Sequence, residues 1–191
     1  MGAFNNPLLF LLIKKEKHPD NGPHTVFFKN GKKQSEINYK DGVQNGQTVV
    51  WYRNGQKAEE YTLKNGLVEG SYSRWHANGQ IEEVYTKKNG KHTGDTSAWH
   101  KNGQLWIKCN YTISGKKDGF CTVWDKKGRV EENEYFVYGL FMFEVNYEMT
   151  EKEVLEYFKD KLNTTNEKRF RKGYKEIFEI RVDELNNKLA E

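Results

Sequence analysis

The sequence contains little proline and little cysteine. Three prolines among 191 residues exclude a proline-rich linker. Two cysteines, Cys109 and Cys121, are too few for the disulfide framework of a small secreted domain. We therefore expect two reduced, packed thiols in a cytoplasmic protein, with an approach of the two cysteines across the turn near Ser114 as the alternative.

Long hydrophobic runs are also missing. Hydrophobic residues make up 36% of the chain and charged residues 30%, which predicts little enclosed core. The most apolar run, residues 7–13, is far too short to span a bilayer as a helix. It lacks the basic start and the small-residue cleavage site of a signal peptide. We expect residues 1–23 to form a capping segment that closes the open end of a sheet, with a membrane-surface or partner anchor as the alternative.

The sequence has no P-loop, no Gly-x-Gly-x-x-Gly after a strand and no nucleophile elbow. His76 and His100 invite a metal site, but their expected separation of about 10 Å, two strand spacings, is too long for one zinc ion. The paired carboxylates at 59–60 and 82–83 should point to opposite faces of a strand, so they do not form acid–base dyads. We expect no enzymatic activity, no cofactor and no metal.

The chain is instead rich in glycine, placed in a fixed register. Asn-Gly pairs recur every 24 residues, with one residue inserted after the fourth pair. Four of the five tryptophans share one repeat position, and the glycine of the pair follows three of them: Trp51, Trp75, Trp99 and Trp124, with Gly55, Gly79 and Gly103. A fixed period of this size indicates a stack of small supersecondary units.

Each unit has the pattern of a β-hairpin. Asn-Gly accepts a positive φ angle at low cost, so it suits a tight turn between two strands. A β-prone run precedes the turn, as at 48–52, and another follows it, as at 58–63. Because side chains alternate along a strand, the tryptophans should share one face of the sheet. Tyr52, His76 and His100, one residue later, should share the other face. We predict a mainly β fold, an elongated single-layer antiparallel sheet of about five such hairpins.

The pattern resembles the MORN repeat in its bacterial variant, which reads as an aromatic residue, a polar pair, Asn-Gly, a second strand and further glycines. The best matches begin at Trp51, Trp75 and Trp99, and the resemblance covers about 115 of 191 residues. It implies a hairpin-repeat fold over 24–141 and, since such arrays mostly serve as binding or assembly surfaces, a binding function. Bacterial proteins of this kind include YwqK-family antitoxins, which implies an antitoxin-like or inhibitor role and a bacterial or phage source. The family has no catalytic residues to transfer.

The pattern changes after Gly139, so we predict a C-terminal strand and helical region over 142–191. Thr150 and Glu153 form a capping box, and apolar residues at helical spacing follow them. A second capping box, Thr164 with Glu167, begins a long helix that should reach Ala190. That helix could pack along the sheet, lie on one face of it or pair with a second copy of the chain.

We predict a protein partner that binds the aromatic sheet face, with a nucleic acid as the less favoured alternative and membrane lipid as the least favoured. Aromatic and arginine side chains are the usual anchors of protein interfaces. The basic start of the last helix is a second candidate surface, for an acidic partner or for homo-oligomer formation. The candidate binding residues are Tyr52, Tyr72, Arg74, His76 and His100 on the sheet, and Lys168, Arg169, Arg171, Lys172 and Lys175 on the helix.

Overall fold

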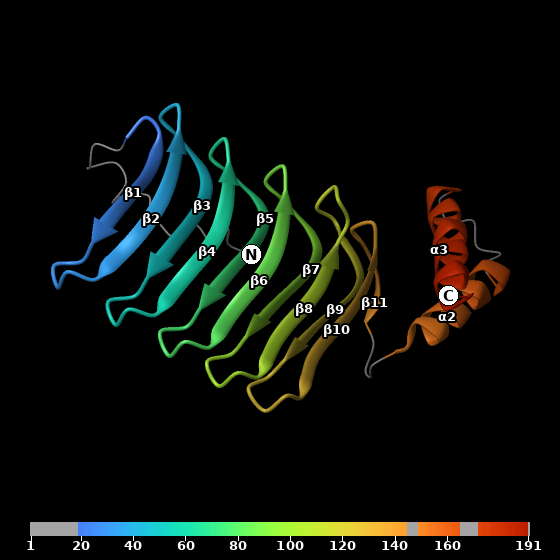
Figure 1. Ribbon diagram of the computed structural model, residues 1–191. Helices are drawn as coiled ribbons and strands as arrows, with labels where there is room; N and C mark the ends of the chain where they lie inside the picture. Colours follow the sequence, from blue (N-terminus) through green and yellow to red (C-terminus); the bar gives the residue numbers. More distant parts are fainter. Residues whose placement is uncertain (1–18, 145–148, 165–171, 191) are drawn as a thin grey trace. The chain divides into compact units, whose positions relative to one another are not determined.

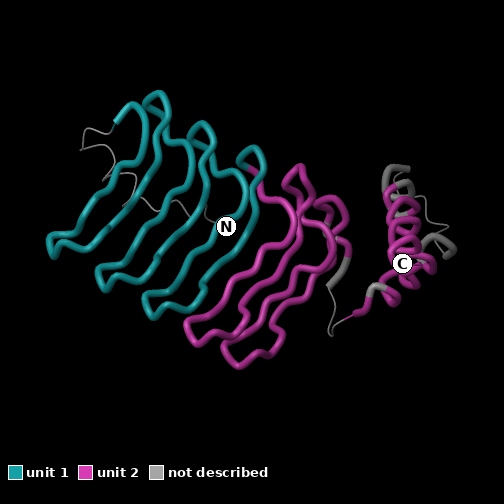
Figure 2. The backbone as a smooth tube through the Cα atoms, in the orientation of Figure 1, with its two compact units in different colours: residues 1–90 teal, residues 91–191 magenta. Residues whose placement is uncertain are grey.

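The computed structural model describes residues 19–144, 149–164 and 172–190. The chain forms two compact units, residues 1–90 and residues 91–191 (Figure 2). The boundary falls between two repeats, and both of the described helices belong to the second unit. The domain boundaries predicted at residues 23 and 141 stay predictions, and residues 1–18 of the predicted capping segment lie outside the described residues.

The first unit is an antiparallel sheet in which every strand pairs with the next one in the chain (Figure 1). Short glycine turns leave no room for a crossover, so chain order becomes sheet order. Its described strands are β1 (Gly22–Phe27), β2 (Lys33–Lys40), β3 (Val43–Trp51), β4 (Lys57–Lys64), β5 (Leu67–Trp75) and β6 (Ile81–Lys88).

The Asn-Gly pairs form the longer of two kinds of turn. In the turn from β3 to β4, the amide of Tyr52 donates to the carbonyl of Gln56 (2.9 Å), and Gly55 has a φ angle of 95°. The side chain of Asn54 accepts from the amide of Gln56 (3.0 Å) and donates to the carbonyl of Ala77 in the next repeat (2.8 Å). The asparagine therefore ties successive turns together, a role beyond the positive φ angle expected from the sequence.

The second kind of turn has two residues, and both carry a positive φ angle. Asn65 (51°) and Gly66 (77°) join Lys64 to Leu67, which pair directly across the hairpin. Two successive positive φ angles are typical of a type I′ turn, whose twist matches the twist of the flanking strands. The tight turn that the sequence assigned to the first Asn-Gly series is therefore made by the second glycine series.

Each tryptophan of the first unit lies beside a lysine side chain. Trp51 pairs with Lys57 across a β-bulge, and the ammonium of Lys33 lies 5.6 Å from the centroid of the Trp51 ring. In the next repeat, the ammonium of Lys57 lies 5.7 Å from the centroid of the Trp75 ring. Each tryptophan thus receives a lysine from the preceding hairpin, a cation–π contact that the repeat duplicates.

The second unit contains antiparallel strands and two helices. Its described elements are β7 (Lys91–Trp99), β8 (Leu105–Tyr111), β9 (Lys117–Trp124), β10 (Val130–Val137), β11 (Leu140–Glu144), α2 (Glu151–Thr164) and α3 (Lys172–Ala190). Together with the strands of the first unit, these elements confirm the predicted mainly β fold of antiparallel hairpins with two C-terminal helices. The prediction that Thr164 caps the second helix is wrong, because Thr164 is the last residue of α2, and Glu167 lies outside the described residues.

The helices of the second unit bury apolar side chains against its sheet. Helix α2 begins at the predicted capping box, where Thr150 Oγ1 accepts from the amide of Glu153 (3.3 Å) and the Glu153 carboxylate accepts from the amide of Thr150 (2.7 Å). Phe158 of α2 and Val137 of β10 are fully buried in one core, to which α3 contributes Leu185. Helix α3 therefore packs on the sheet of its own unit.

The expectation of two reduced cysteines is wrong in this structure. Cys109 of β8 pairs directly with Cys121 of β9, and their Cα atoms are 4.1 Å apart. The two side chains form a disulfide that packs against Phe136. The twelve-residue separation places the cysteines opposite each other because β8 and β9 are consecutive strands of one hairpin.

Candidate functional site

Three tyrosines form a stack on one face of the first unit. Tyr61 of β4 pairs with Tyr72 of β5, which pairs with Tyr85 of β6. The ring centroids are 5.4 Å apart between Tyr61 and Tyr72 and 4.4 Å apart between Tyr72 and Tyr85, with interplanar angles of 22° and 7°. Burial raises the pKa of all three phenols, and neighbouring glutamates add to the rise.

A group of charged side chains lies beside this stack. Arg74 sits between Glu59 and Glu83 in the strand register, and its Nη2 atom is 3.0 Å from Glu83. Its Nε atom is 3.5 Å from Glu82, whose carboxylate is also 3.6 Å from Nδ1 of His76. Three carboxylates therefore surround one guanidinium, and the group has a surplus of negative charge.

The expectation that Glu82 and Glu83 point to opposite faces is wrong. The register shifts after Arg74, so that Trp75 pairs with Ile81 and one extra residue stands in β6. A β-bulge of this kind breaks the alternation of side chains. Both carboxylates consequently reach Arg74, which regular alternation would not allow.

The pKa values in the charged group are set by burial and by the neighbouring charges. Burial alone would lower the pKa of Arg74, but Glu82 and Glu83 outweigh it and raise that pKa, which keeps the guanidinium charged. Burial raises the pKa of Glu83 above its ordinary value, against the opposite effect of Arg74. Glu59 is only 7% exposed, so its carboxylate lies inside the group and not at its edge.

Tyr52 connects the charged group to the turn of the preceding hairpin. Its hydroxyl donates to the carbonyl of Trp75 (2.8 Å). Burial raises the pKa of Tyr52, and Glu82 raises it further. Four predicted binding residues therefore meet in the first unit. We call the whole set the aromatic-charged cluster: Tyr52, Glu59, Tyr72, Arg74, His76, Glu82 and Glu83.

The remaining predicted residues lie elsewhere. His100 is in the second unit, where its Nε2 atom is hydrogen-bonded to the carbonyl of Trp124 (2.9 Å) and its ring is tilted against Trp106. Lys168, Arg169 and Arg171 are outside the described residues, as are the side chains of two residues within α3, Lys172 and Lys175. The binding role of these residues stays a prediction.

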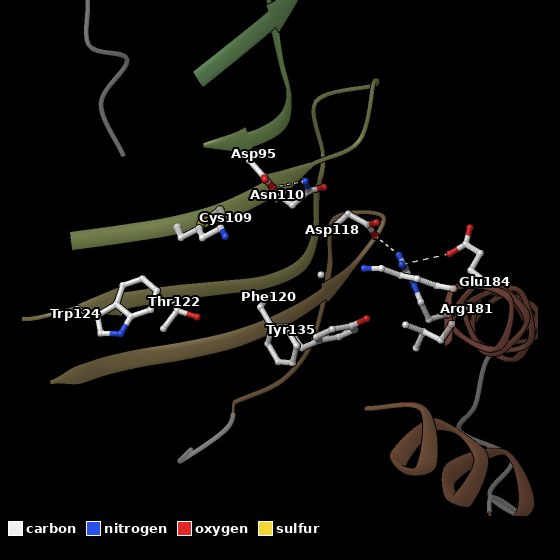
Figure 3. A pocket seen from close by; sticks show the side chains of 14 residues that line it. Asp95, Cys109, Asn110, Asp118, Phe120, Thr122, Trp124, Tyr135, Arg181 and Glu184 are labelled. Atoms are coloured by element: carbon white, nitrogen blue, oxygen red, sulfur yellow. Dashed lines mark hydrogen bonds and ion pairs between the residues drawn. The ribbon is translucent and has the colours of Figure 1, made fainter. Parts of the chain in front are cut away.

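A cavity of about 480 Å³ lies between α3 and the sheet of the second unit (Figure 3). Its sheet side carries the rings of Phe120 and Trp124, and its helix side carries Arg181. Arg181 bridges Asp118 of β9 and Glu184 of its own helix, a set of contacts that the sequence did not reveal. Residues distant in the chain meet here because α3 packs on the sheet.

Two general properties of the described residues bear on function. Among them, no group of three or more histidine, cysteine, aspartate or glutamate side chains could hold a metal ion. None of the helices, as far as the structure describes them, is long and apolar enough to cross a membrane.

Comparison with known proteins identifies the repeat. The family model described as "MORN repeat variant" matches residues 20–41 and 93–112. These two segments therefore match the MORN-type repeat. No curated protein matches the chain. A solved structure, accessory secretory protein 1, 2 and 3 of Streptococcus pneumoniae, is similar at 16% identity and a TM-score of 0.36. That match covers 81% of this chain, which spans only 27% of the other.

The carboxylates of the aromatic-charged cluster were missed by sequence reasoning. From the sequence, the paired carboxylates at 59–60 and 82–83 were expected to point to opposite faces of a strand, so they were not expected to form a site. The signal that could have found them is the bulge position, which recurs just after each Asn-Gly turn and lets two successive side chains share a face.

Proposed function

We propose that this chain is a non-enzymatic protein-binding module that uses the aromatic-charged cluster as its contact surface. The observation that carries the proposal is the convergence of Tyr52, Tyr72, Arg74 and His76 around three carboxylates. Tyrosine and arginine are the residue types that most often dominate binding energy at protein interfaces. The MORN-type repeats support a binding surface in place of a catalytic site.

The charge of the cluster favours a basic protein surface over a nucleic acid. Glu59, Glu82 and Glu83 outnumber Arg74, so the cluster repels phosphate groups and attracts lysine or arginine side chains of a partner. Nucleic-acid surfaces carry an excess of positive charge, which supplies most of their affinity. A protein with an exposed basic residue is therefore the partner that we propose for this face.

The more specific role that we propose is that of an antitoxin-like or inhibitor protein in a bacterial or phage cytoplasm. The resemblance to YwqK-family antitoxins is its support. The disulfide between Cys109 and Cys121 stands against a cytoplasmic location, since cytosolic thiols are kept reduced. Mass measurement of alkylated thiols in freshly lysed cells would decide this point, because two alkylated cysteines mean a reducing compartment.

The experiment that tests the proposed function is affinity capture from the native source with mass spectrometry. The bait is the full chain, and a matched bait carries Glu82→Gln and Glu83→Gln, which remove charge but keep side-chain shape. A control bait carries Phe27→Ala, an aromatic change on β1 at a residue that is 56% exposed. We expect one stoichiometric protein with the unchanged and control baits, and at least a ten-fold loss with the double glutamine variant.

The salt dependence of binding separates the partner classes. The proposed protein partner, held by desolvated aromatic contacts together with ion pairs to the cluster carboxylates, should lose affinity only moderately between low and moderate salt. A nucleic acid should dissociate steeply, and reversal of the basic helix charges by Arg169→Glu with Lys172→Glu should abolish its binding. Capture of nucleic acid or lipid alone contradicts the proposal, as does a partner that is unaffected by the glutamine changes.

A further inference from the structure

The cavity in the second unit combines apolar rings with polar groups of both kinds. Phe120 and Trp124 lie four residues apart on β9 and face the same side, with the polar Thr122 between them. From Asp118 to Trp124 the strand extends about 20 Å at the usual rise per residue. The lining residues of this groove therefore follow β9 over several positions and include two aromatic rings, an arrangement suited to a chain-like ligand.

The charges around the groove cancel. Its lining contains three cationic side chains, Lys108, Arg181 and Lys188, and three anionic ones, Asp95, Asp118 and Glu184. A phosphate or nucleotide site would need a surplus of positive charge. A purely apolar ligand would leave the charged groups poorly solvated. The lining thus favours a neutral ligand that both donates and accepts hydrogen bonds.

Two polar side chains of the rim are arranged as a pair. Asn110 Nδ2 donates to Asp95 Oδ1 (2.8 Å), since β7 and β8 place these residues directly opposite each other. The pair offers amide and carboxylate groups side by side, which can both donate to and accept from neighbouring hydroxyls. Lys108, on the next outward-facing position of β8, adds an ammonium donor.

The opposite wall holds a donor that is short of an acceptor. The Nη atoms of Arg181 meet Asp118 and Glu184, but the buried Nε atom has no hydrogen-bond partner among the described residues. The Arg181 side chain as a whole is 10% exposed, and it lines the groove. The NMR signal of its Nε–H group should therefore shift when a ligand with a hydrogen-bond acceptor enters the groove.

We propose that this groove binds a neutral oligosaccharide. A sugar ring presents an apolar C–H face that packs on an aromatic ring such as Trp124, while Phe120, which packs against the core around Tyr135, adds apolar lining beside it. Its hydroxyls are donors and acceptors at once, and adjacent hydroxyls match the paired groups of Asp95 and Asn110. The volume of about 480 Å³ lies within the range of small-molecule sites. This ligand is independent of the partner proposed for the aromatic-charged cluster.

The test is an NMR titration of the isotope-labelled full chain with maltotriose, cellotriose and chitotriose. We expect at least one trisaccharide to shift the indole N–H of Trp124 and the Nε–H of Arg181. Sorbitol, which has hydroxyls but no ring face, should shift neither signal. The variants Asp95→Ala and Lys108→Met should each weaken binding about five-fold, the effect of one lost hydrogen bond. The matched variant Lys127→Met, in an exposed turn, should bind as the unchanged chain does.

Several results would overturn the proposal. One is the absence of any shift at Trp124 and Arg181 with all three trisaccharides. Another is equal or tighter binding of trigalacturonate, which would make the site anionic in its preference. A third is a shift with N-acetyl-Gly-Phe-Gly-amide in place of the sugars, which would make the groove a peptide site. Amide resonances of α2, which belongs to the same unit as the groove but does not line it, serve as a folding check for the variants. The result of affinity capture, which tests the aromatic-charged cluster, does not depend on whether the groove binds a sugar.

Discussion

In the first unit, Tyr61 of β4 stacks on Tyr72 of β5, whereas at the equivalent repeat positions of the second unit Cys109 of β8 is joined to Cys121 of β9. The first unit has six described strands and no described helix, and the second has five strands and two helices packed on its sheet. The same hairpin pattern is thus stabilised across one face by aromatic contact in one unit and by a covalent bond in the other. The repeat determines which two positions face each other, but different residue types can occupy those positions.

The largest expected effect concerns the helices, which among the described residues belong only to the second unit. Phe158→Ala should lower the free energy of unfolding of the second unit by about 3–5 kcal/mol, because the buried ring leaves a cavity between α2 and the sheet. Urea denaturation followed by amide signals of β9 and β10 measures the loss. Lys152→Ala, at an exposed position of the same helix, should change stability by less than about 0.5 kcal/mol. A small effect of Phe158→Ala would mean that the helices contribute little to this unit.

The next effect compares the disulfide with the tyrosine stack. Replacing both cysteines with alanine should cost about 3 kcal/mol, since the unfolded chain loses a cross-link that closes a short loop. Replacing both with tyrosine should recover part of that loss, because Tyr61 and Tyr72 occupy the same pair of repeat positions. Thermal unfolding under oxidising and reducing conditions checks both variants. If the tyrosine pair is no better than the alanine pair, the two sites are not interchangeable.

The tyrosine stack also predicts a response to alkali. Tyrosine in the unfolded chain loses its proton near pH 10, whereas the raised pKa of Tyr72 keeps the folded phenol protonated. The folded state then binds more protons, so stability falls as the pH rises above 10, by at most about 1.4 kcal/mol per pH unit for one tyrosine. Tyr72→Phe should make the slope shallower in urea denaturation between pH 9 and pH 11. An unchanged slope would contradict a raised pKa at this residue.

The turn asparagines should have a smaller effect. Asn54→Asp keeps the acceptor for the amide of Gln56 but loses the donor to the carbonyl of Ala77, so we expect a loss of about 1 kcal/mol. Asn54→Ala loses both bonds and should cost more. Asn54→Asp with the same stability as the unchanged chain in urea denaturation would show that the bond between successive turns is unimportant.

The smallest expected effect concerns Asp125, at the repeat position of Tyr52 and His100. Its carboxylate bonds within its own turn, to the amide of Arg129 (2.9 Å) and the amide of Lys127 (2.8 Å). The backbone bond from Arg129 is the main cause that lowers the pKa of Asp125 to about 2. A depressed carboxyl pKa stabilises the fold above the unfolded value of 3.8, and that contribution is lost as the pH falls towards 2. Asp125→Asn should remove this small acid-sensitive component in denaturation series below pH 4.

The hairpin repeat, the capping box of α2 and the family resemblance could all be predicted from the sequence. Glycine register and strand alternation are local properties, so the positions of Gly55 and Trp51 are enough to place turns and faces. The same local rules failed at Glu82, where a bulge shifts the register, and at Asn54, whose side chain bonds to the following repeat.

Which side chains meet across elements depends on how the strands and helices pack, and this could not be predicted from the sequence. The disulfide of Cys109 with Cys121 depends on the register of two strands, and the groove beside Arg181 depends on how α3 packs on β9. Periodicity shows that a helix has an apolar face but not which surface covers it. That choice is made by contacts between residues far apart in the chain, such as Asp118 with Arg181, which no local pattern encodes.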